Sequence, residues 1–351
     1  MSFRTRNEEK SSEYDKSTAY QAHAKDFSLR FEMTSLFDFN YLFLKTHCFF
    51  ALAGTLDRES YAKRQVTIGY INRSNATASV PLVVQNWAGH MYNNLKIIPI
   101  TLLDQYHSDI SDDLQSQFNN LTDAELSTDT FSFYTSVASV FSSKIEGEEI
   151  ELDSYIKHKK FGVDFQPDYT RKIDDLYNAY TFAKTNTLNK SNIAQAHQLL
   201  TKNILAKHQQ GKARVQNMYV STPDGKIEYV AALPGQVESE MAKLYADIDY
   251  LLSVELNIQE TFFYASLIHL VFVKIHPFTD GNGRTARLLE KWFLSQKLGP
   301  KAWFIQSEKN YYQNHQTYYN HLRALGLEYQ DLAYIKALAF LLMLPTSLNL
   351  Q

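Results

Sequence analysis

The chain has 351 residues, of which 44% are hydrophobic and 21% charged, so it can bury a large core and divide into more than one lobe. A formal net charge of -3 and a pI of about 6.4 give no general attraction to nucleic acid or to an anionic membrane, so phosphate binding must depend on local groups. The single cysteine, Cys48, excludes an internal disulfide, and residues 1–10 lack the apolar centre of a signal peptide. These features favour a cytoplasmic protein that binds neither nucleic acid nor a membrane.

The first third of the chain carries the weakest structural signal. Residues 1–25 are polar and charged without a period, which indicates a mobile or loosely docked arm. Residues 27–127 alternate short apolar runs with polar loops and predict no particular fold. We therefore treat residues 1–127 as an N-terminal region of unknown role and uncertain fold.

Helical patterns dominate the rest of the chain. Apolar residues recur at spacings of three and four in the segments 130–147, 167–184, 190–203 and 236–253. Only 12 glycines and 8 prolines interrupt the sequence, and no regular run of strands is present, so the protein is predicted to be mainly α. The apolar run 337–344 is far shorter than the roughly 20 residues of a spanning helix, so no membrane segment is expected.

One segment, residues 213–234, departs from the helical pattern. Two strand-like runs flank Pro223, Asp224 and Gly225, a combination that favours a tight turn closing a β-hairpin. A two-stranded hairpin is marginal alone and must lean on other structure. It is either a packing decoration or an element that serves a neighbouring site.

Residues 276–287, HPFTDGNGRTAR, concentrate chemically active side chains between two helical segments. The apolar residues 261–274 before them predict a buried helix, and residues 285–299 after them have helical periodicity and end in glycine. The motif is therefore predicted to be a helix–loop–helix junction.

The second half of this motif suits an anion. Gly281, Asn282 and Gly283 stand where a helix begins, so their backbone N–H groups and the helix dipole favour a phosphate. Arg284 and Arg287 are three residues apart on a similar helix face, and their guanidiniums suit forked contacts with phosphate oxygens. The pattern predicts a polyphosphate site.

The first half of the motif supplies a base and a metal ligand. His276 has an ordinary pKa near physiological pH and can accept a proton from a hydroxyl. Asp280 is a hard oxygen ligand for Mg²⁺, with nucleotide phosphates and water completing the shell. Each residue has a structural alternative, since the histidine could cap a helix, the Gly-Asn-Gly turn could connect two helices and the arginines could form surface ion pairs. These alternatives do not explain why all of them meet in one junction. Phe278 is expected to anchor the loop in the core.

The motif resembles the signature of the Fic/DOC family, HPFx[DE]GNGRxxR, at every specified position. The resemblance implies a Fic-type helical core that transfers AMP from ATP to a serine, threonine or tyrosine hydroxyl of a target protein. It implies His276 as the base, Asp280 as the magnesium ligand, Asn282 and the glycine amides on the α and β phosphates, and Arg284 and Arg287 on the distal phosphates.

The resemblance extends to other segments. The hairpin resembles the flap, which covers the site and binds a target segment by strand addition. Tyr311 and Tyr312 lie where the family places adenine contacts, although core packing is at least as good an explanation for either. The resemblance covers residues 130–322 and leaves the target and a homodimer as open expectations.

A second motif, SSKIEG, matches the inhibitory pattern [ST]xxxE[GN] of the family. It begins at Ser142 and ends with Glu146 and Gly147. The resemblance implies that Glu146 pairs with Arg287 and keeps it from the γ phosphate, since a carboxylate competes for the same guanidinium. A solvated acidic helix end is the alternative, because charged residues follow.

The predicted organisation has four parts, which are the N-terminal region 1–127, an inhibitory helix segment 128–160, a Fic catalytic core 161–325 and a C-terminal helix 326–351. An autoinhibited adenylyltransferase is the leading hypothesis. The alternatives are a nucleotide-gated binding module with negligible turnover, and a Fic enzyme that removes AMP or transfers another phosphate-containing group. His269, seven residues before His276, is predicted to be a hydrogen-bonded core histidine.

Overall fold

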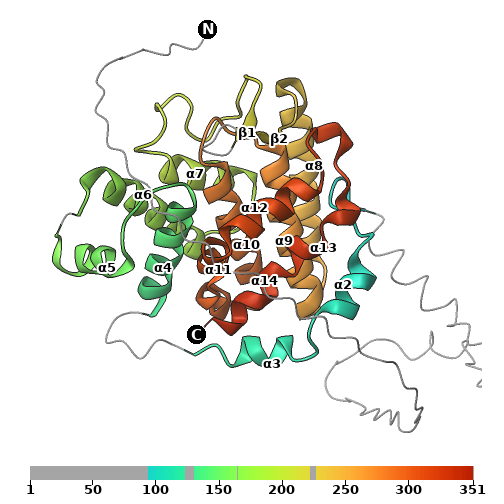
Figure 1. Cartoon of the computed structure of the whole chain (residues 1–351), viewed down its shortest axis with the longest axis horizontal. Helices are drawn as coiled ribbons and strands as arrows, with labels where there is room; N and C mark the ends of the chain where they lie inside the picture. The colour runs from blue at the N-terminus through green and yellow to red at the C-terminus, as the bar shows by residue number, and fades with distance from the viewer. Residues whose placement is uncertain (1–93, 123–129, 164, 222–226, 351) are drawn as a thin grey trace, which may run out of the picture. The chain divides into compact units, whose positions relative to one another are not determined.

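The computed structural model describes residues 94–122, 130–163, 165–221 and 227–350, which belong to one compact unit spanning residues 77–351. The predicted arm, Cys48 and the predicted turn at Pro223, Asp224 and Gly225 lie outside these ranges. Within them the protein is mainly α, with one small hairpin, as predicted (Figure 1). The longer helices are α2 (Leu103–Asp109), α3 (Leu114–Asn119), α4 (Thr130–Ile145), α5 (Leu152–Phe161), α6 (Pro167–Thr185), α7 (Lys190–Leu200), α8 (Pro234–Ser253), α9 (Ile258–Ile275), α10 (Asn282–Leu298), α11 (Ser307–Gln313) and α12 (His315–Ala324).

Helix α9 is the centre of the core. Asn257 and Glu260 form a capping box at its start, in which each side chain accepts the backbone N–H of the other at 2.9 Å. From Thr261 onward all of its residues are buried, as expected for a helix that is apolar on every side. By length and composition it could cross a membrane, but 89% of its apolar window is buried inside the protein.

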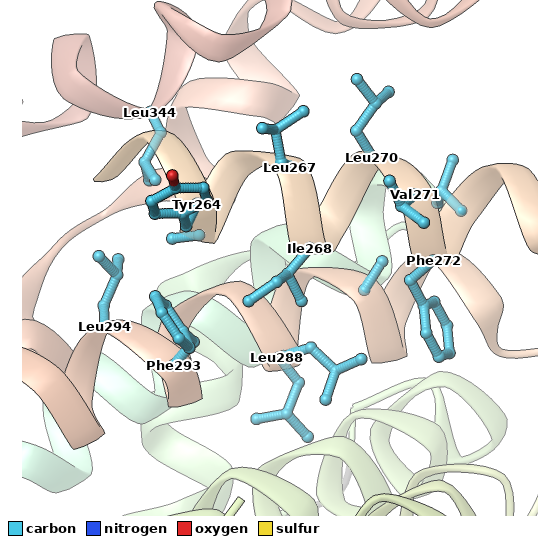
Figure 2. Close-up of a cluster of buried hydrophobic side chains, with 14 of the residues drawn as sticks. Tyr264, Leu267, Ile268, Leu270, Val271, Phe272, Leu288, Phe293, Leu294 and Leu344 are labelled. Atoms are coloured by element: carbon cyan, nitrogen blue, oxygen red, sulfur yellow. The ribbon is translucent and has the colours of Figure 1, made fainter. Parts of the chain in front are cut away.

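Helix α10 runs beside α9, and the two helices pack against each other more extensively than any other pair of the described elements (Figure 1). Figure 2 shows Ile268 and Phe272 of α9 facing Leu288 and Phe293 of α10, all with their side chains buried. Each such side chain contributes roughly 1.5–3 kcal/mol by leaving water. The junction between these two helices is therefore held rigidly, and it carries the signature motif.

Helix α4 is anchored on both sides of its C-terminal half. Ala138 and Ile145 join the main core, while Val140 packs with Ile150 and Ile173 in a second cluster between α4, α5 and α6. This double anchoring fixes the end of α4 against the start of α10, which it also contacts.

The hairpin consists of β1 (Tyr219–Ser221) and β2 (Ile227–Val230), which pair antiparallel with Val220 opposite Tyr229. The other edge of β2 is tied to the segment that follows α12, because the Val230 N–H donates to the Leu327 carbonyl at 2.7 Å. An ion pair between Glu228 and Arg323 of α12 adds a second tie. The predicted hairpin is present, and it leans on two segments that follow the signature motif.

The predicted helices at 130–147, 167–184, 190–203 and 236–253 are present as α4, α6, α7 and α8, with ends displaced by up to three residues. The single helix predicted for 326–351 is wrong. The Leu327 carbonyl accepts the Val230 N–H of β2, and the Ala333 N–H donates to the Leu325 carbonyl, so this segment forms short turns instead of one helix. These are η2 (Tyr329–Asp331), η3 (Tyr334–Lys336), α13 (Leu338–Leu341), α14 (Met343–Thr346) and η4 (Ser347–Asn349), while η1 (Pro300–Phe304) lies before α11.

Part of the N-terminal region has a definite fold. Helices α2 and α3 both contact α9, and Leu102, Tyr106 and Phe118 belong to the main core. Asp247 of α8 is fully buried and accepts the backbone N–H groups of residues 96–98 at 2.6–2.8 Å. The sequence pattern does not predict that residues 96–98 pack against α8, because the group that anchors them is one carboxylate about 150 residues away.

Candidate active site

The signature loop begins where α9 ends at His276, which has φ 54° and ψ 60°. This left-handed conformation is uncommon for a residue with a side chain, and it turns the chain away from the helix axis. Asn282 closes the loop, because its side chain accepts the Phe278 N–H at 2.9 Å and donates to the Phe278 carbonyl at 2.8 Å. The Asn282 side chain therefore helps to shape the loop, and its contact with a phosphate stays a prediction.

Arg214 fixes the same turn from the side of the hairpin. Its guanidinium is buried and donates to the carbonyl oxygens of His276 at 2.7 Å, Ile275 at 3.2 Å, Gln216 at 2.6 Å and Ala232. The first two carbonyls belong to the signature junction, and the last two stand just before and after the hairpin. One side chain thus holds the base of the hairpin to the end of α9.

His276 is neutral in this environment. Burial lowers its pKa to about 4, and the contact with the Val273 carbonyl only partly opposes this effect. Its Nδ1 lies 3.3 Å from the Val273 carbonyl oxygen and 3.2 Å from the Tyr229 hydroxyl. A carbonyl can only accept, so Nδ1 carries the proton and Nε2 keeps a lone pair. A neutral imidazole with an unprotonated Nε2 can act as a general base near pH 7.

The start of α10 has the geometry of an anion site. Gly281 has φ 79°, and a Cβ there would lie 2.7 Å from Thr201 Cγ2, so only glycine fits. Gly283 follows within the first turn of a 17-residue helix, where free N–H groups and the helix dipole favour negative charge. The structure brings His276, both glycines and Arg287 to one junction.

A carboxylate from α4 lies at this anion site. Gly147, with φ 93°, lets the chain reverse after α4, and Glu146 points back over the start of α10. A Cβ built on Gly283 would lie only 2.5 Å from Glu146 Oε1. The side chain of Glu146 is three-quarters buried, and its carboxylate stands where a bound phosphate would gain from the helix dipole.

Arg287 is held by this carboxylate and by Ser142. Its Nη2 donates to Glu146 Oε1 at 2.6 Å and to the Ser142 carbonyl at 3.0 Å, and its Nε donates to Ser142 Oγ at 2.8 Å. Burial acts to raise the pKa of Glu146, but the charges of Arg287 and Arg284 outweigh it and hold that pKa below its ordinary value. Glu146 is therefore ionised and paired at neutral pH.

Arg284 has its own pair of carboxylates. Its Nη1 lies 3.3 Å from Glu148 Oε1, and its Nη2 lies 3.3 Å from Asp280 Oδ1. Glu148 is buried, it also faces Lys172 at 3.5 Å, and its Oε2 has no hydrogen-bond partner among the described residues. Burial raises the pKa of Glu148 more than Arg284 and Lys172 lower it.

Asp280 fits the part of a magnesium ligand that depends on a nucleotide. Its side chain is about half exposed, at 51%, so one carboxylate faces the open side of the loop. No group of three metal-binding side chains occurs among the described residues, so phosphate oxygens and water would have to supply most of the ligands. Magnesium binding stays a prediction.

His197 of α7 holds the loop that carries Asp280 through a ring contact and a hydrogen bond. It is fully buried and stacks on Phe278 with ring centroids 3.6 Å apart. Its Nδ1 accepts the Gly211 N–H at 2.8 Å, so Nε2–H donates to the Asp280 carbonyl at 2.9 Å, and burial lowers its pKa to about 4. A single histidine on an amphipathic helix gives no signal of this role in the sequence.

The two tyrosines predicted as adenine contacts occupy different surroundings. Tyr311 is fully buried and donates its hydroxyl to Glu290 at 2.8 Å, so core packing, the alternative explanation, describes its position and leaves no exposed ring face for a base. His269 donates to the same Glu290 carboxylate at 2.8 Å and is the predicted hydrogen-bonded core histidine. Tyr312 is partly buried, 5.6 Å from the Phe141 ring of α4, and its contact with adenine stays a prediction.

Comparison with known proteins identifies the same region. The Fic/DOC family profile matches residues 187–294. Over 104 residues the chain is 36% identical to the protein adenylyltransferase Fic of Nematostella vectensis, and over 79 residues it is 39% identical to the protein adenylyltransferase fic-1 of Caenorhabditis briggsae. These matches cover 29% and 22% of this chain, but only 22% and 14% of the two relatives.

Solved structures agree at the level of fold. A Fic family protein from Desulfovibrio desulfuricans superposes with a TM-score of 0.57 at 19% identity, covering 73% of this chain and 75% of its own. A Fic domain containing signaling protein from Bacteroides thetaiotaomicron gives 0.50 at 20% identity, covering 71% and 93%. The signature junction and the family match thus indicate a Fic/DOC domain over residues 187–294, and the fold of the chain resembles that of Fic family proteins.

Proposed function

We propose that this protein is an adenylyltransferase that transfers AMP from ATP to a serine, threonine or tyrosine hydroxyl of a target protein. The observation that carries the proposal is the neutral His276, with Nε2 unprotonated, beside a helix start that carries two arginines. A base and an anion site that meet in this way suit the transfer of a phosphate-containing group to a hydroxyl. The printed names of the two curated relatives support the same activity.

The residues divide the reaction between them. The target hydroxyl attacks the α phosphorus of ATP, His276 Nε2 takes the hydroxyl proton, and the bond to the β phosphate oxygen breaks to release pyrophosphate. Gly283, and Gly281 once its N–H leaves the Asp280 carboxylate to which it donates here, present backbone N–H groups to the phosphates, and Arg284 and Arg287 neutralise the distal ones. Magnesium, held by Asp280 and the phosphates, would offset the charge of the leaving pyrophosphate.

We further propose that the enzyme is autoinhibited by Glu146. Its carboxylate pairs with Arg287 and lies against Gly283, so a nucleotide must compete with it for both the guanidinium and the helix start. The proposed target strand would add to β1, whose outer edge is unpaired among the described residues.

The test is incubation with ATP labelled at the α phosphate and with magnesium, followed by mass spectrometry. Wild type, Glu146→Gly and Glu146→Gly with His276→Ala are compared. We expect AMP on the protein itself, most of it on the Glu146→Gly variant and none on the double variant. Nucleotide binding without AMP incorporation in any variant would favour the gated binding module, whereas loss of AMP from a pre-modified protein would favour the reverse reaction.

A further inference from the structure

The flap reaches the catalytic histidine through a tyrosine that the signature does not contain. Tyr229 lies on β2, is 2% exposed and stands directly opposite Val220 of the edge strand. Its hydroxyl donates to the Val273 carbonyl at 3.0 Å and lies 3.2 Å from His276 Nδ1. Its ring stands at 69° to the imidazole, with centroids 6.1 Å apart.

The protons of this contact can be assigned. The Tyr229 hydroxyl has one proton and gives it to the Val273 carbonyl, so toward His276 the hydroxyl oxygen can only accept. The Val273 carbonyl is the other acceptor, 3.3 Å from Nδ1. Tyr229, at 3.2 Å, is therefore one of two acceptors that keep the proton on Nδ1.

The Tyr229 ring is itself held in place. Lys274 Nζ lies 4.0 Å from the ring centroid, is buried with its side chain, and has no hydrogen-bond partner among the described residues. Burial lowers the pKa of Lys274 to about 7, so near neutral pH only part of the molecules carry a cation that is attracted to the aromatic face, and packing of the lysine against the ring adds to this contact. The ring is thus fixed between α9 and the hairpin.

We propose that Tyr229 is a positioning residue for the base. Its hydroxyl holds His276 in the Nδ1–H tautomer, which leaves Nε2 unprotonated toward the target hydroxyl. This inference rests on the proposed role of His276. It makes the flap part of the proton-transfer apparatus, because the residue opposite Tyr229 belongs to the strand on which a target would dock.

The experiment measures the tautomer and the kinetics separately. Nitrogen-15 NMR of histidine-labelled protein reports which ring nitrogen carries the proton, and the His276→Asn variant assigns the His276 signals. Wild type is expected to give the Nδ1–H form, and Tyr229→Phe a mixture with Nε2–H. In the Glu146→Gly background, Tyr229→Phe should lower kcat about three- to tenfold, the worth of one neutral hydrogen bond, with KM for ATP unchanged.

Tyr329→Phe is the matched control, because it also loses one hydroxyl bond, to Glu240 at 2.8 Å, but outside the site. Its kcat and its His276 signals should match the parent. An Nε2–H form in wild type, or identical His276 signals in Tyr229→Phe, would overturn the proposal. The NMR result needs no turnover, so a failure of the transferase function itself would show separately, as absent AMP incorporation in every variant.

A different observation concerns Glu148. The reversal at Gly147 sends two carboxylates of one short segment to the two signature arginines, Glu146 to Arg287 and Glu148 to Arg284. The backbone supports this reversal, because the Glu148 N–H donates to the Ser143 carbonyl at 3.2 Å. Glu148 is 5% exposed, so its ion pair with Arg284 is shielded from water and is weakened little by dissolved salt.

We infer that Glu148 is a second restraint on the same site, one that occupies the first signature arginine while Glu146 occupies the second. In the Glu146→Gly background, Glu148→Gln and Glu148→Asp should each raise the rate of AMP incorporation a further three- to tenfold. The reason is that each substitution weakens the hydrogen bond from Arg284 to the Glu148 carboxylate. Glu149→Gln is the matched control, because Glu149 is the exposed neighbour and loses the same charge.

The direction of the change decides the outcome. A rate increase with both Glu148 variants, and none with Glu149→Gln, supports the restraint. A rate that falls or stays level would mean that Glu148 orients Arg284 for catalysis or only anchors α4, and either result overturns the inference. If wild type and Glu146→Gly both fail to incorporate AMP, the proposed function fails instead.

Discussion

Replacing Glu146 with glycine tests the proposed restraint most directly. The substitution removes the 2.6 Å contact to Arg287 and the carboxylate over Gly283, while both Ser142 contacts to Arg287 remain. Position 146 follows the last residue of α4, so glycine there does not interrupt the helix. The fold should therefore survive the change.

The size of the effect follows from the lost contact. A hydrogen bond between charged groups contributes roughly 1.5–3 kcal/mol, and Glu146 is buried enough for a value in that range. If the freed guanidinium binds the γ phosphate in the transition state, the rate of AMP incorporation should rise about ten- to a hundredfold. Arg287→Ala added to Glu146→Gly should abolish the gain, because the freed partner is gone.

The assay is the time course of labelled AMP incorporation for wild type, the single variant, the double variant and Glu149→Gly as the matched control. Thermal unfolding of each protein checks that the fold is kept. A Glu146→Gly rate no faster than wild type would refute the reasoning, and α4 would then be a structural helix only. The transferase proposal would survive that result, since it rests on the signature junction.

Three further predictions concern the signature region. His276→Ala should abolish AMP transfer and leave ATP affinity largely unchanged, which calorimetry and the incorporation assay measure side by side; retained transfer would remove His276 from its role. Asp280→Asn should raise the magnesium concentration needed for half-maximal transfer, because an amide is a poorer ligand than a carboxylate, and an unchanged requirement would contradict the assignment. Burial lowers the pKa of both His197 and His276 to about 4, against about 6.5 when unfolded, so the unfolded state binds more protons between these values, and each of the two histidines should lower the free energy of unfolding by about 3 kcal/mol as pH drops from 6.5 to 4. Urea unfolding at about pH 7 and about pH 4.5 measures this loss, and an unchanged midpoint would contradict it.

The signature residues were predictable because they are close in sequence. His276, Gly281, Gly283 and Arg287 span a helix–loop–helix whose geometry follows from the apolar helix before it and the glycines within it. The pairing of Glu146 with Arg287 spans 141 residues, and only the family resemblance suggested it. The contact is present in the structure, whereas its inhibitory effect stays a prediction.

The supporting residues were not predictable, because tertiary contacts alone give them their roles. Tyr229, Arg214 and His197 each act through one or two hydrogen bonds to a loop that is 44 to 83 residues away. Periodicity places such residues on a helix or a strand but does not say which partner they meet. The same limit applies to Tyr311, which is buried and whose hydroxyl donates to Glu290 of another helix.

The double anchoring of α4 bears on how the proposed autoinhibition could be relieved. Ala138 and Ile145 fill the main core, so cleavage or deletion of the helix would expose apolar surface and leave the Arg287 guanidinium buried without Ser142. Activation by removing the inhibitory segment would thus damage the fold that carries the reaction. Under the proposed autoinhibition, an activator would instead act on the few atoms beyond Ile145, by turning the Glu146 side chain aside while α4 stays in place.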